Sequence, residues 1–122
     1  MEQVMLGRTG IITNKNGFGA LPIQRVSTEY AGMLLKKAYC AGITFFDTAR
    51  SYSDSEEKIG LALSDVRQDI ILATKTPSTT VEGFWRDLET SLRLMKTNYI
   101  DLYQFHNPDF CPKPGDGSGL YE

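Results

Sequence analysis

Apolar residues along this chain fall into short continuous runs that alternate with longer amphipathic segments. The continuous runs occupy residues 43–47, 69–75 and 100–106, and they are apolar on both faces, as strands buried in a parallel sheet are. The segments between them carry apolar residues at helical spacing, most clearly at Phe84 and Leu88. Strands alternating with helices of ten or more residues predict right-handed βαβ units, so the chain belongs to the α/β class.

Start and stop signals predict where the helices lie. Thr28 is expected to cap a helix that continues to residue 39 or 40, with Gly42 just beyond its end. A short helix is expected to begin at residue 54 or 55. A longer one is expected to begin at Thr80 and to reach about residue 96.

The first twenty residues carry turn signals instead of helical periodicity. Residues 2–6 and 11–15 flank the loop GRTG, whose length and glycines predict a β-hairpin. Residues 17–21 predict a short glycine-rich strand that Pro22 ends. The expected order is therefore an N-terminal hairpin followed by about four parallel strands with helices.

Two parallel architectures compete for this order of elements. A doubly wound dinucleotide fold needs G-x-G-x-x-G after its first strand; Gly17 and Gly19 match, but Pro22 occupies the third glycine position. In a (β/α)8 barrel, functional residues stand at the carboxyl ends of successive strands. The predicted strands end in three ionisable residues: Asp47, Lys75 and His106. This pattern favours the barrel.

Each of these residues alone has an ordinary structural interpretation. Asp47 would cap a turn, Lys75 would be a solvated strand end, and Tyr52 would be an exposed loop aromatic. His106, the single histidine, would more often be structural than catalytic. Because side chains alternate along a strand, the three end residues can point to one interior, where Tyr52 can reach them. The joint pattern favours a functional site over four separate coincidences.

The chemistry of these four side chains is mutually consistent. An ammonium beside a phenol stabilises its phenolate, so Lys75 would help Tyr52 to act as a general acid. Asp47 would keep Lys75 charged, and His106 would orient a polarised oxygen. Proton donation to an oxygen that develops negative charge is what reduction of a carbonyl by hydride requires. No side chain donates hydride, so a nicotinamide would have to supply it.

The sequence resembles the N-terminal half of an aldo-keto reductase. The resemblance rests on LGRTG at 6–10, GFG at 17–19, AGITFFDTA at 41–49, YSDSE at 52–56, ATK at 73–75 and IDLYQFHNP at 100–108. It implies a catalytic tetrad of Asp47, Tyr52, Lys75 and His106. In that tetrad Tyr52 is the proton donor, Lys75 and Asp47 are its tuning pair, and His106 orients the carbonyl.

The same resemblance implies a fold, a cofactor and a substrate class. The fold is a (β/α)8 barrel closed at its base by an N-terminal hairpin. The cofactor is NADPH, with NADH not excluded, and Gly19, Ala20 and Asp47 lie near it. The substrate is a small aldehyde or ketone, which is reduced to an alcohol.

A chain of 122 residues is short for this fold, since a complete barrel needs about 250. We therefore expect residues 1–122 to form a single partial domain, half a barrel, truncated relative to the family. Most dinucleotide contacts would lie in the other half, so the isolated chain is expected to be inactive. Two unpaired sheet edges would also favour self-association of half-barrels.

Composition narrows the remaining function classes. A net charge of −2 with 23% charged residues gives no electrostatic reason to expect nucleic acid or an acidic membrane. The sequence shows no signal peptide and no apolar span, and two distant cysteines exclude a CxxC site, so we expect a cytoplasmic protein. A short-chain dehydrogenase needs Y-x-x-x-K, but Glu56 occupies that lysine position. A non-catalytic binding or scaffold module of the same family stays open as the alternative.

Overall fold

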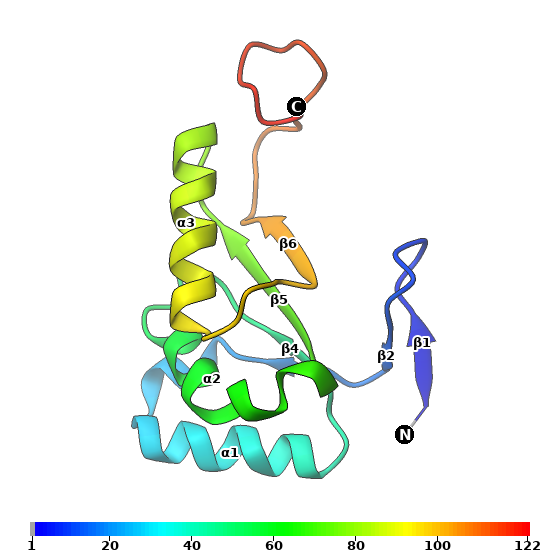
Figure 1. Ribbon diagram of the computed structural model, residues 1–122, viewed down its shortest axis with the longest axis vertical. Helices are drawn as coiled ribbons and strands as arrows, with labels where there is room; N and C mark the ends of the chain where they lie inside the picture. The colour runs from blue at the N-terminus through cyan, green and yellow to red at the C-terminus, as the bar shows by residue number, and fades with distance from the viewer. Residues whose placement is uncertain (1) are drawn as a thin grey trace.

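The computed structural model describes residues 2–122 and contains two separate sheets (Figure 1). The N-terminal hairpin is antiparallel, with Val4 opposite Thr13; its strands are β1 (Gln3–Met5) and β2 (Ile12–Asn14). The second sheet is parallel, with its strands in chain order: β3 (Phe18–Gly19), β4 (Phe45–Asp47), β5 (Ile71–Thr76) and β6 (Leu102–Phe105). A hairpin followed by four parallel strands is the order that the sequence predicts.

Three helices cover one face of the parallel sheet, and the chain returns through them from each strand to the next (Figure 1). They are α1 (Thr28–Cys40), α2 (Ser55–Leu63) and α3 (Val81–Leu94). Two 3₁₀ segments, η1 (Pro22–Arg25) and η2 (Ser64–Asp69), lead into α1 and β5. The C-terminal residues form a loop beyond the carboxyl end of β6.

The observed boundaries correct several predicted ones. Ser27, not Thr28, caps α1, because its hydroxyl accepts the Tyr30 amide at 3.1 Å. The three buried strands begin two residues later than predicted, since η2 takes up residues 64–69 and residues 99–101 belong to a polar network. Strand β6 ends at Phe105, which places His106 just beyond it. Helix α3 was predicted to run from Thr80 to about residue 96; Thr80 is instead its cap, and the helix spans Val81–Leu94.

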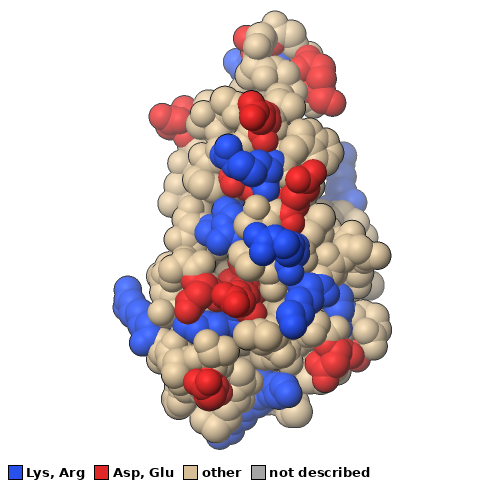
Figure 2. Space-filling view, turned by 60° about the vertical axis from the view of Figure 1, so that its left-hand side comes forward, with Lys and Arg blue, Asp and Glu red and all other residues tan. Residues whose placement is uncertain are grey.

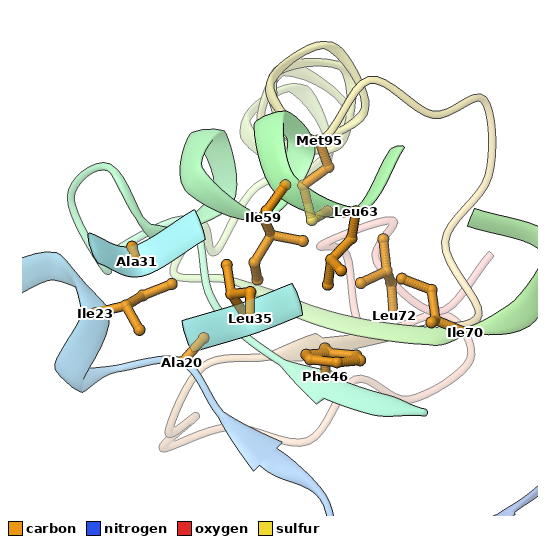
Figure 3. Packing of buried hydrophobic residues seen from close by; sticks show 11 residues of the cluster. Ala20, Ile23, Ala31, Leu35, Phe46, Ile59, Leu63, Ile70, Leu72 and Met95 are labelled. Atoms are coloured by element: carbon orange, nitrogen blue, oxygen red, sulfur yellow. The ribbon is translucent and has the colours of Figure 1, made fainter. Parts of the chain in front are cut away.

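The hydrophobic core lies between the helices and the sheet (Figure 3). Phe46 and Leu72 point from the sheet toward the helices and are at most 1% exposed, whereas the neighbouring Phe45 and Asp47 are only partly buried. Leu35 of α1 and Leu63 of α2 meet them from the other side. Burying a side chain of this size contributes roughly 1.5–3 kcal/mol. This packing fixes which face of each strand is turned away from the helices.

Close approach of α2 to the end of α3 depends on Gly60. A Cβ at this position would lie 2.2 Å from the Leu94 carbonyl oxygen and 2.8 Å from Met95 Cα. Both of these atoms belong to the backbone and cannot rotate away. Gly60 therefore sets the distance at which the two helices pack.

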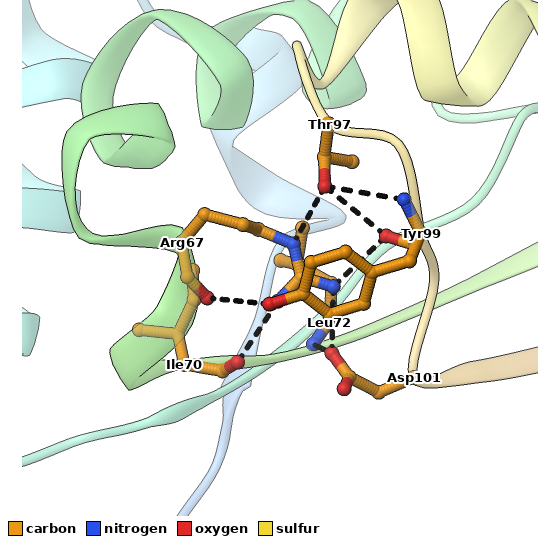
Figure 4. A network of polar contacts seen from close by, with 6 residues as sticks. All are labelled: Arg67, Ile70, Leu72, Thr97, Tyr99 and Asp101. Atoms are coloured by element: carbon orange, nitrogen blue, oxygen red, sulfur yellow. Dashed lines mark hydrogen bonds and ion pairs between the residues drawn. The ribbon is translucent and has the colours of Figure 1, made fainter.

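A polar network lies at the amino ends of β5 and β6, which we call the base of the sheet (Figure 4). Arg67, 7% exposed, donates to the Ile70 and Tyr99 carbonyls at 2.9 Å, to Thr97 Oγ1 at 3.0 Å and to Asp101 Oδ2 at 2.8 Å. The guanidinium also stacks on the Tyr99 ring, 3.8 Å from its centroid. The network thus joins η2 to the start of β6.

Surface charge and cysteines add little to this picture. Acidic and basic side chains are interspersed over the face shown in Figure 2. None of the helices is both long and apolar enough to cross a membrane, within residues 2–122. The two cysteines, Cys40 and Cys111, are free and exposed. No group of three or more His, Cys, Asp or Glu side chains in this part of the chain is arranged to hold a metal ion.

Candidate active site

The four candidate catalytic residues lie together at the carboxyl end of the parallel sheet, which we call the mouth. Asp47 is the last residue of β4, Lys75 is the second-last of β5, and His106 follows β6 directly. Tyr52 stands in the loop between β4 and α2. Parallel strands in chain order bring these ends to one edge, as the sequence predicts.

Lys75 and Asp47 form the electrostatic centre of the mouth. The Lys75 ammonium lies 3.0 Å from Asp47 Oδ1 and 2.8 Å from Oδ2, and it donates to the Thr48 carbonyl at 2.7 Å. These three acceptors match the three N–H donors of an ammonium. The Lys75 side chain is 16% exposed and that of Asp47 is 35% exposed. The pair is therefore held in place while one edge of the carboxylate faces solvent.

Tyr52 lies between Lys75 and His106. Its ring centroid is 5.3 Å from the Lys75 ammonium, a cation–π distance, and 5.5 Å from the His106 ring, which it meets at 90°. Within residues 2–122, no hydrogen bond joins the Tyr52 hydroxyl to Lys75. The ammonium therefore contacts the face of the ring and not the hydroxyl, a geometry that the sequence does not reveal.

His106 carries a buried ring nitrogen that lacks a hydrogen-bond partner among the described residues. Its backbone N–H donates to the Thr76 carbonyl at 2.9 Å, and Asn107 turns the chain away with φ of +43°. The Nδ1 atom is buried and has no hydrogen-bond partner in the described chain. Buried polar atoms are paired in the great majority of cases, so this nitrogen is an exception among the described residues, as are Thr13 Oγ1, Ser91 Oγ and the Tyr103 hydroxyl.

The predicted cofactor-contacting residues differ in what they offer. Gly19 pairs with Asp47 in the sheet and is exposed, and a Cβ there would meet nothing within 4 Å. Ala20 is fully buried. Its N–H donates to the Asp47 carbonyl at 2.8 Å, and its carbonyl accepts from Ser55 Oγ at 3.0 Å. The structure therefore gives Ala20 the role of a support for Asp47, because none of its surface is open to a ligand.

Sequence reasoning missed one residue of this region, Glu56. It is fully buried in the first turn of α2, where it pairs with Arg50 and accepts a hydrogen bond from Thr74. The signal was available, because Glu56 shares a helix face with Ile59 and Leu63 at spacings of three and seven. A carboxylate on an apolar helix face predicts a buried, paired charge.

Comparisons with known proteins agree with this geometry. The model of the Aldo/keto reductase family matches residues 13–113. Aldo-keto reductase YhdN of Bacillus subtilis is 33% identical over 89% of this chain and 39% of its own length. L-galactose dehydrogenase of Arabidopsis thaliana is 31% identical over 90% of this chain and 39% of its own length.

Solved structures show the same relationship. The holo form of aldo-keto reductase AKR11C1 from Bacillus halodurans superposes with a TM-score of 0.81 and 31% identity, over 87% of this chain and 40% of that one. The chain thus spans about two-fifths of the length of these relatives. The superposition confirms the predicted half of a (β/α)8 barrel with its N-terminal hairpin. The chain belongs to the aldo-keto reductase family.

Proposed function

We propose that this chain is the N-terminal portion of an NAD(P)H-dependent oxidoreductase that reduces aldehydes and ketones to alcohols. One observation carries the proposal: the Lys75 ammonium, paired with Asp47, lies 5.3 Å from the centroid of the Tyr52 ring, and that ring makes a T-shaped contact with His106. Such a cluster brings together a phenol, a cation and an imidazole. These are the groups that a developing alkoxide needs.

Each side chain has a distinct part in this proposal. Tyr52 donates its hydroxyl proton to the carbonyl oxygen of the substrate. The Lys75 ammonium, held by Asp47 and the Thr48 carbonyl, stabilises the negative charge that Tyr52 then carries. His106 orients the carbonyl oxygen by hydrogen bonding. The nicotinamide supplies the hydride when it is bound.

The residues at the mouth suit a dinucleotide on two counts. Gly19 lets a ligand approach the backbone, and Asp47 keeps part of its carboxylate open beside it. NADPH and NADH are both compatible with these two residues. Since this chain spans 39% of YhdN, we propose that most contacts to the dinucleotide come from the portion that it does not span. The chain alone should then be inactive.

NADPH binding and oxidation test this proposal. Binding is followed by quenching of Trp85, the single tryptophan, and turnover by NADPH absorbance with a reactive aromatic aldehyde. We expect no binding to the chain alone at millimolar NADPH. Joined to the portion of YhdN that it does not span, the chain should oxidise NADPH, and Tyr52→Phe should lower that rate by roughly 10²–10⁴-fold.

Tyr30→Phe is the matched control, because Tyr30 is half exposed on α1, far along the chain from the mouth. It should leave the rate of the joined protein unchanged. A Tyr52→Phe variant that keeps the full rate would show that Tyr52 is not the proton donor. NADPH oxidation by the isolated chain would show that the second portion is dispensable.

We also propose that the isolated chain self-associates through its sheet edges, with a second copy as partner. Within residues 2–122, β3 and β6 each have one side without a strand partner, and neither carries Lys or Pro, which commonly protect free edges. Two sets of four parallel strands give the eight of a closed barrel. Gln104→Lys on β6 should therefore reduce the mass from about twice 13.6 kDa to 13.6 kDa.

The control is Gln68→Lys, the same change at an exposed position of η2. It should leave the mass unchanged in sedimentation at low micromolar concentration. A stable wild-type monomer under these conditions would contradict self-association, and a dimer that both variants retain would contradict pairing through the β6 edge.

A further inference from the structure

Glu56 is a fully buried carboxylate placed where an apolar side chain would cost less. It is 0% exposed, one oxygen pairs with the Arg50 guanidinium, and the other accepts the Thr74 hydroxyl at 2.8 Å. Removing a charge from water is unfavourable, and well-packed apolar residues often replace a buried ion pair without loss of stability. Glu56 instead links two elements of the mouth, because its partners Arg50 and Thr74 belong to the loop after β4 and to β5.

The first partner controls the loop that carries Tyr52. Arg50 and Glu56 bracket Tyr52 in the sequence, so their ion pair closes a short ring of chain around it. Inside this ring Ser53 adopts φ of +41°, a left-handed conformation that is unfavourable for a residue with a Cβ. Such a conformation persists only where the surrounding contacts hold it. The Ser53 hydroxyl donates to Gln24 at 2.9 Å and Asp54 pairs with Lys58 at 3.0 Å, while the Arg50–Glu56 pair joins the two ends of the ring.

The second partner controls the strand that carries Lys75. Thr74 is fully buried, faces α2 and immediately precedes Lys75 on β5. The Arg50 backbone N–H also donates to the Lys75 carbonyl at 2.9 Å. Loop, helix and strand therefore meet at one carboxylate, and the meeting point lies directly behind the ammonium and the phenol of the site.

We propose that Glu56 is a positioning residue: it fixes the Tyr52 ring against His106 and over Lys75. It touches none of the reacting groups and acts through Arg50 and Thr74. Its placement of Tyr52 stands on geometry alone, whereas its value for turnover rests on the proposed reductase function.

A single histidine makes the proposal directly measurable in the chain as it is. The imidazole C–H signals in a proton NMR spectrum belong to His106 without further assignment. The Tyr52 ring lies 5.5 Å from this ring in a T-shaped contact, so its ring current shifts those signals. Tyr52→Leu gives the signal position without the aromatic ring, and Tyr52→Phe gives the position with the ring but without the hydroxyl. Spectra over pH 5–9 allow comparison at one protonation state.

Glu56→Gln keeps the size of the side chain but removes its charge. We expect it to move the His106 signals at least halfway toward their position in Tyr52→Leu, while circular dichroism shows a folded chain. Arg50→Lys, which keeps an opposite charge for Glu56, should retain more of the wild-type signal than Arg50→Gln. A role limited to stability predicts no such graded response in the signals of a folded chain.

Asp101→Asn is the matched control, since it weakens a second buried Arg–carboxylate pair at the other end of the strands. It should lower stability and leave the His106 signals in place. If Glu56→Gln does not fold, Thr74→Val removes only the hydrogen bond to the strand and should shift the signals in the same direction. The proposal is overturned if the folded variants keep the wild-type signals, or if Asp101→Asn shifts them equally.

This readout also separates the positioning role from the proposed function, because it needs neither NADPH nor turnover. Shifted His106 signals in Glu56→Gln, together with an inactive joined protein, would leave the positioning role standing and refute the reductase proposal. Unshifted signals together with Tyr52-dependent oxidation of NADPH by the joined protein would refute the positioning role and support the reductase proposal.

Discussion

The base and the mouth of the parallel sheet both hold a cation paired with a carboxylate, but they treat polar atoms differently. At the base, Arg67 donates to four acceptors, and Asp101 Oδ2 accepts from both Arg67 and the Leu72 amide. At the mouth, Lys75 is satisfied by Asp47 and Thr48, yet the neighbouring His106 Nδ1 is buried without a partner in the described chain.

This difference separates stability from function along the same strands. The base pair is well buried, with side chains 8% and 18% exposed, and its hydrogen bonds tie three chain segments together. The pair at the mouth is 16% and 35% exposed and leaves room beside it. An unsatisfied buried nitrogen lowers stability unless a ligand completes it. Under the proposed function a bound ligand would offset this cost at the mouth, whereas the side chains of the network at the base all have partners.

The largest effect on stability is therefore expected at the base. Asp101→Ala leaves the buried Arg67 guanidinium without its anion and the Leu72 amide without its acceptor. Breaking a buried pair in this way costs about 3 kcal/mol or more. Urea unfolding followed by far-UV circular dichroism measures the loss of unfolding free energy.

Asp65→Ala serves as the control for this variant, because Asp65 is an exposed carboxylate of η2, the segment that also contains Arg67. Its unfolding free energy should stay within about 0.5 kcal/mol of wild type. Equal losses for the two variants would mean that the network in Figure 4 contributes nothing specific.

A smaller effect is expected at the mouth. Lys75→Met removes the ammonium, but Asp47 is sufficiently exposed to be hydrated in its place. The unfolding free energy should change by about 1 kcal/mol or less, as for partly exposed ion pairs. In the joined protein with YhdN, the same variant should abolish NADPH oxidation. A loss of stability as large as that of Asp101→Ala would contradict the division between base and mouth.

The sequence was sufficient to place the mouth but not to describe its contacts. Asp47, Lys75 and His106 end consecutive apolar runs, and this local pattern is enough to bring them to one edge of a parallel sheet. Periodicity says which face a residue occupies and nothing about distances between side chains. The contact of Lys75 with the ring of Tyr52 instead of its hydroxyl therefore could not be predicted.

Contacts between segments far apart in the chain could not be predicted from the sequence either. Arg67 and Asp101 are 34 residues apart, and no spacing rule joins them. Ala20 is fully buried, and its carbonyl accepts a hydrogen bond from Ser55 Oγ of α2. Only the assembled fold decides this contact. Glu56 is intermediate, since its face on α2 follows from periodicity but its partners do not. Local pattern thus predicts elements and faces, and tertiary packing selects the partners.

The smallest effect on stability at neutral pH is expected from Tyr103, which sharpens the comparison because its buried polar atom lies on the face of the sheet that packs against α3. Its buried hydroxyl lies beside that of Thr76, which donates to Asp87 at 2.6 Å, and it makes no hydrogen bond of normal geometry with the described residues. Since no ligand site explains this atom, Tyr103→Phe should be neutral or stabilising by up to about 1 kcal/mol at pH 7.

At alkaline pH the unfolding free energies of wild type and Tyr103→Phe should diverge. Burial raises the pKa of Tyr103 to about 12, above the ordinary value of about 10 that it has in the unfolded chain. Below pH 10 both states keep the proton; between pH 10 and 12 the unfolded state loses it first, so wild-type stability falls. Tyr103→Phe lacks this loss, and its advantage in urea unfolding should grow from pH 9 to pH 11. A constant difference across that range would show that the Tyr103 hydroxyl is already hydrated in the folded chain.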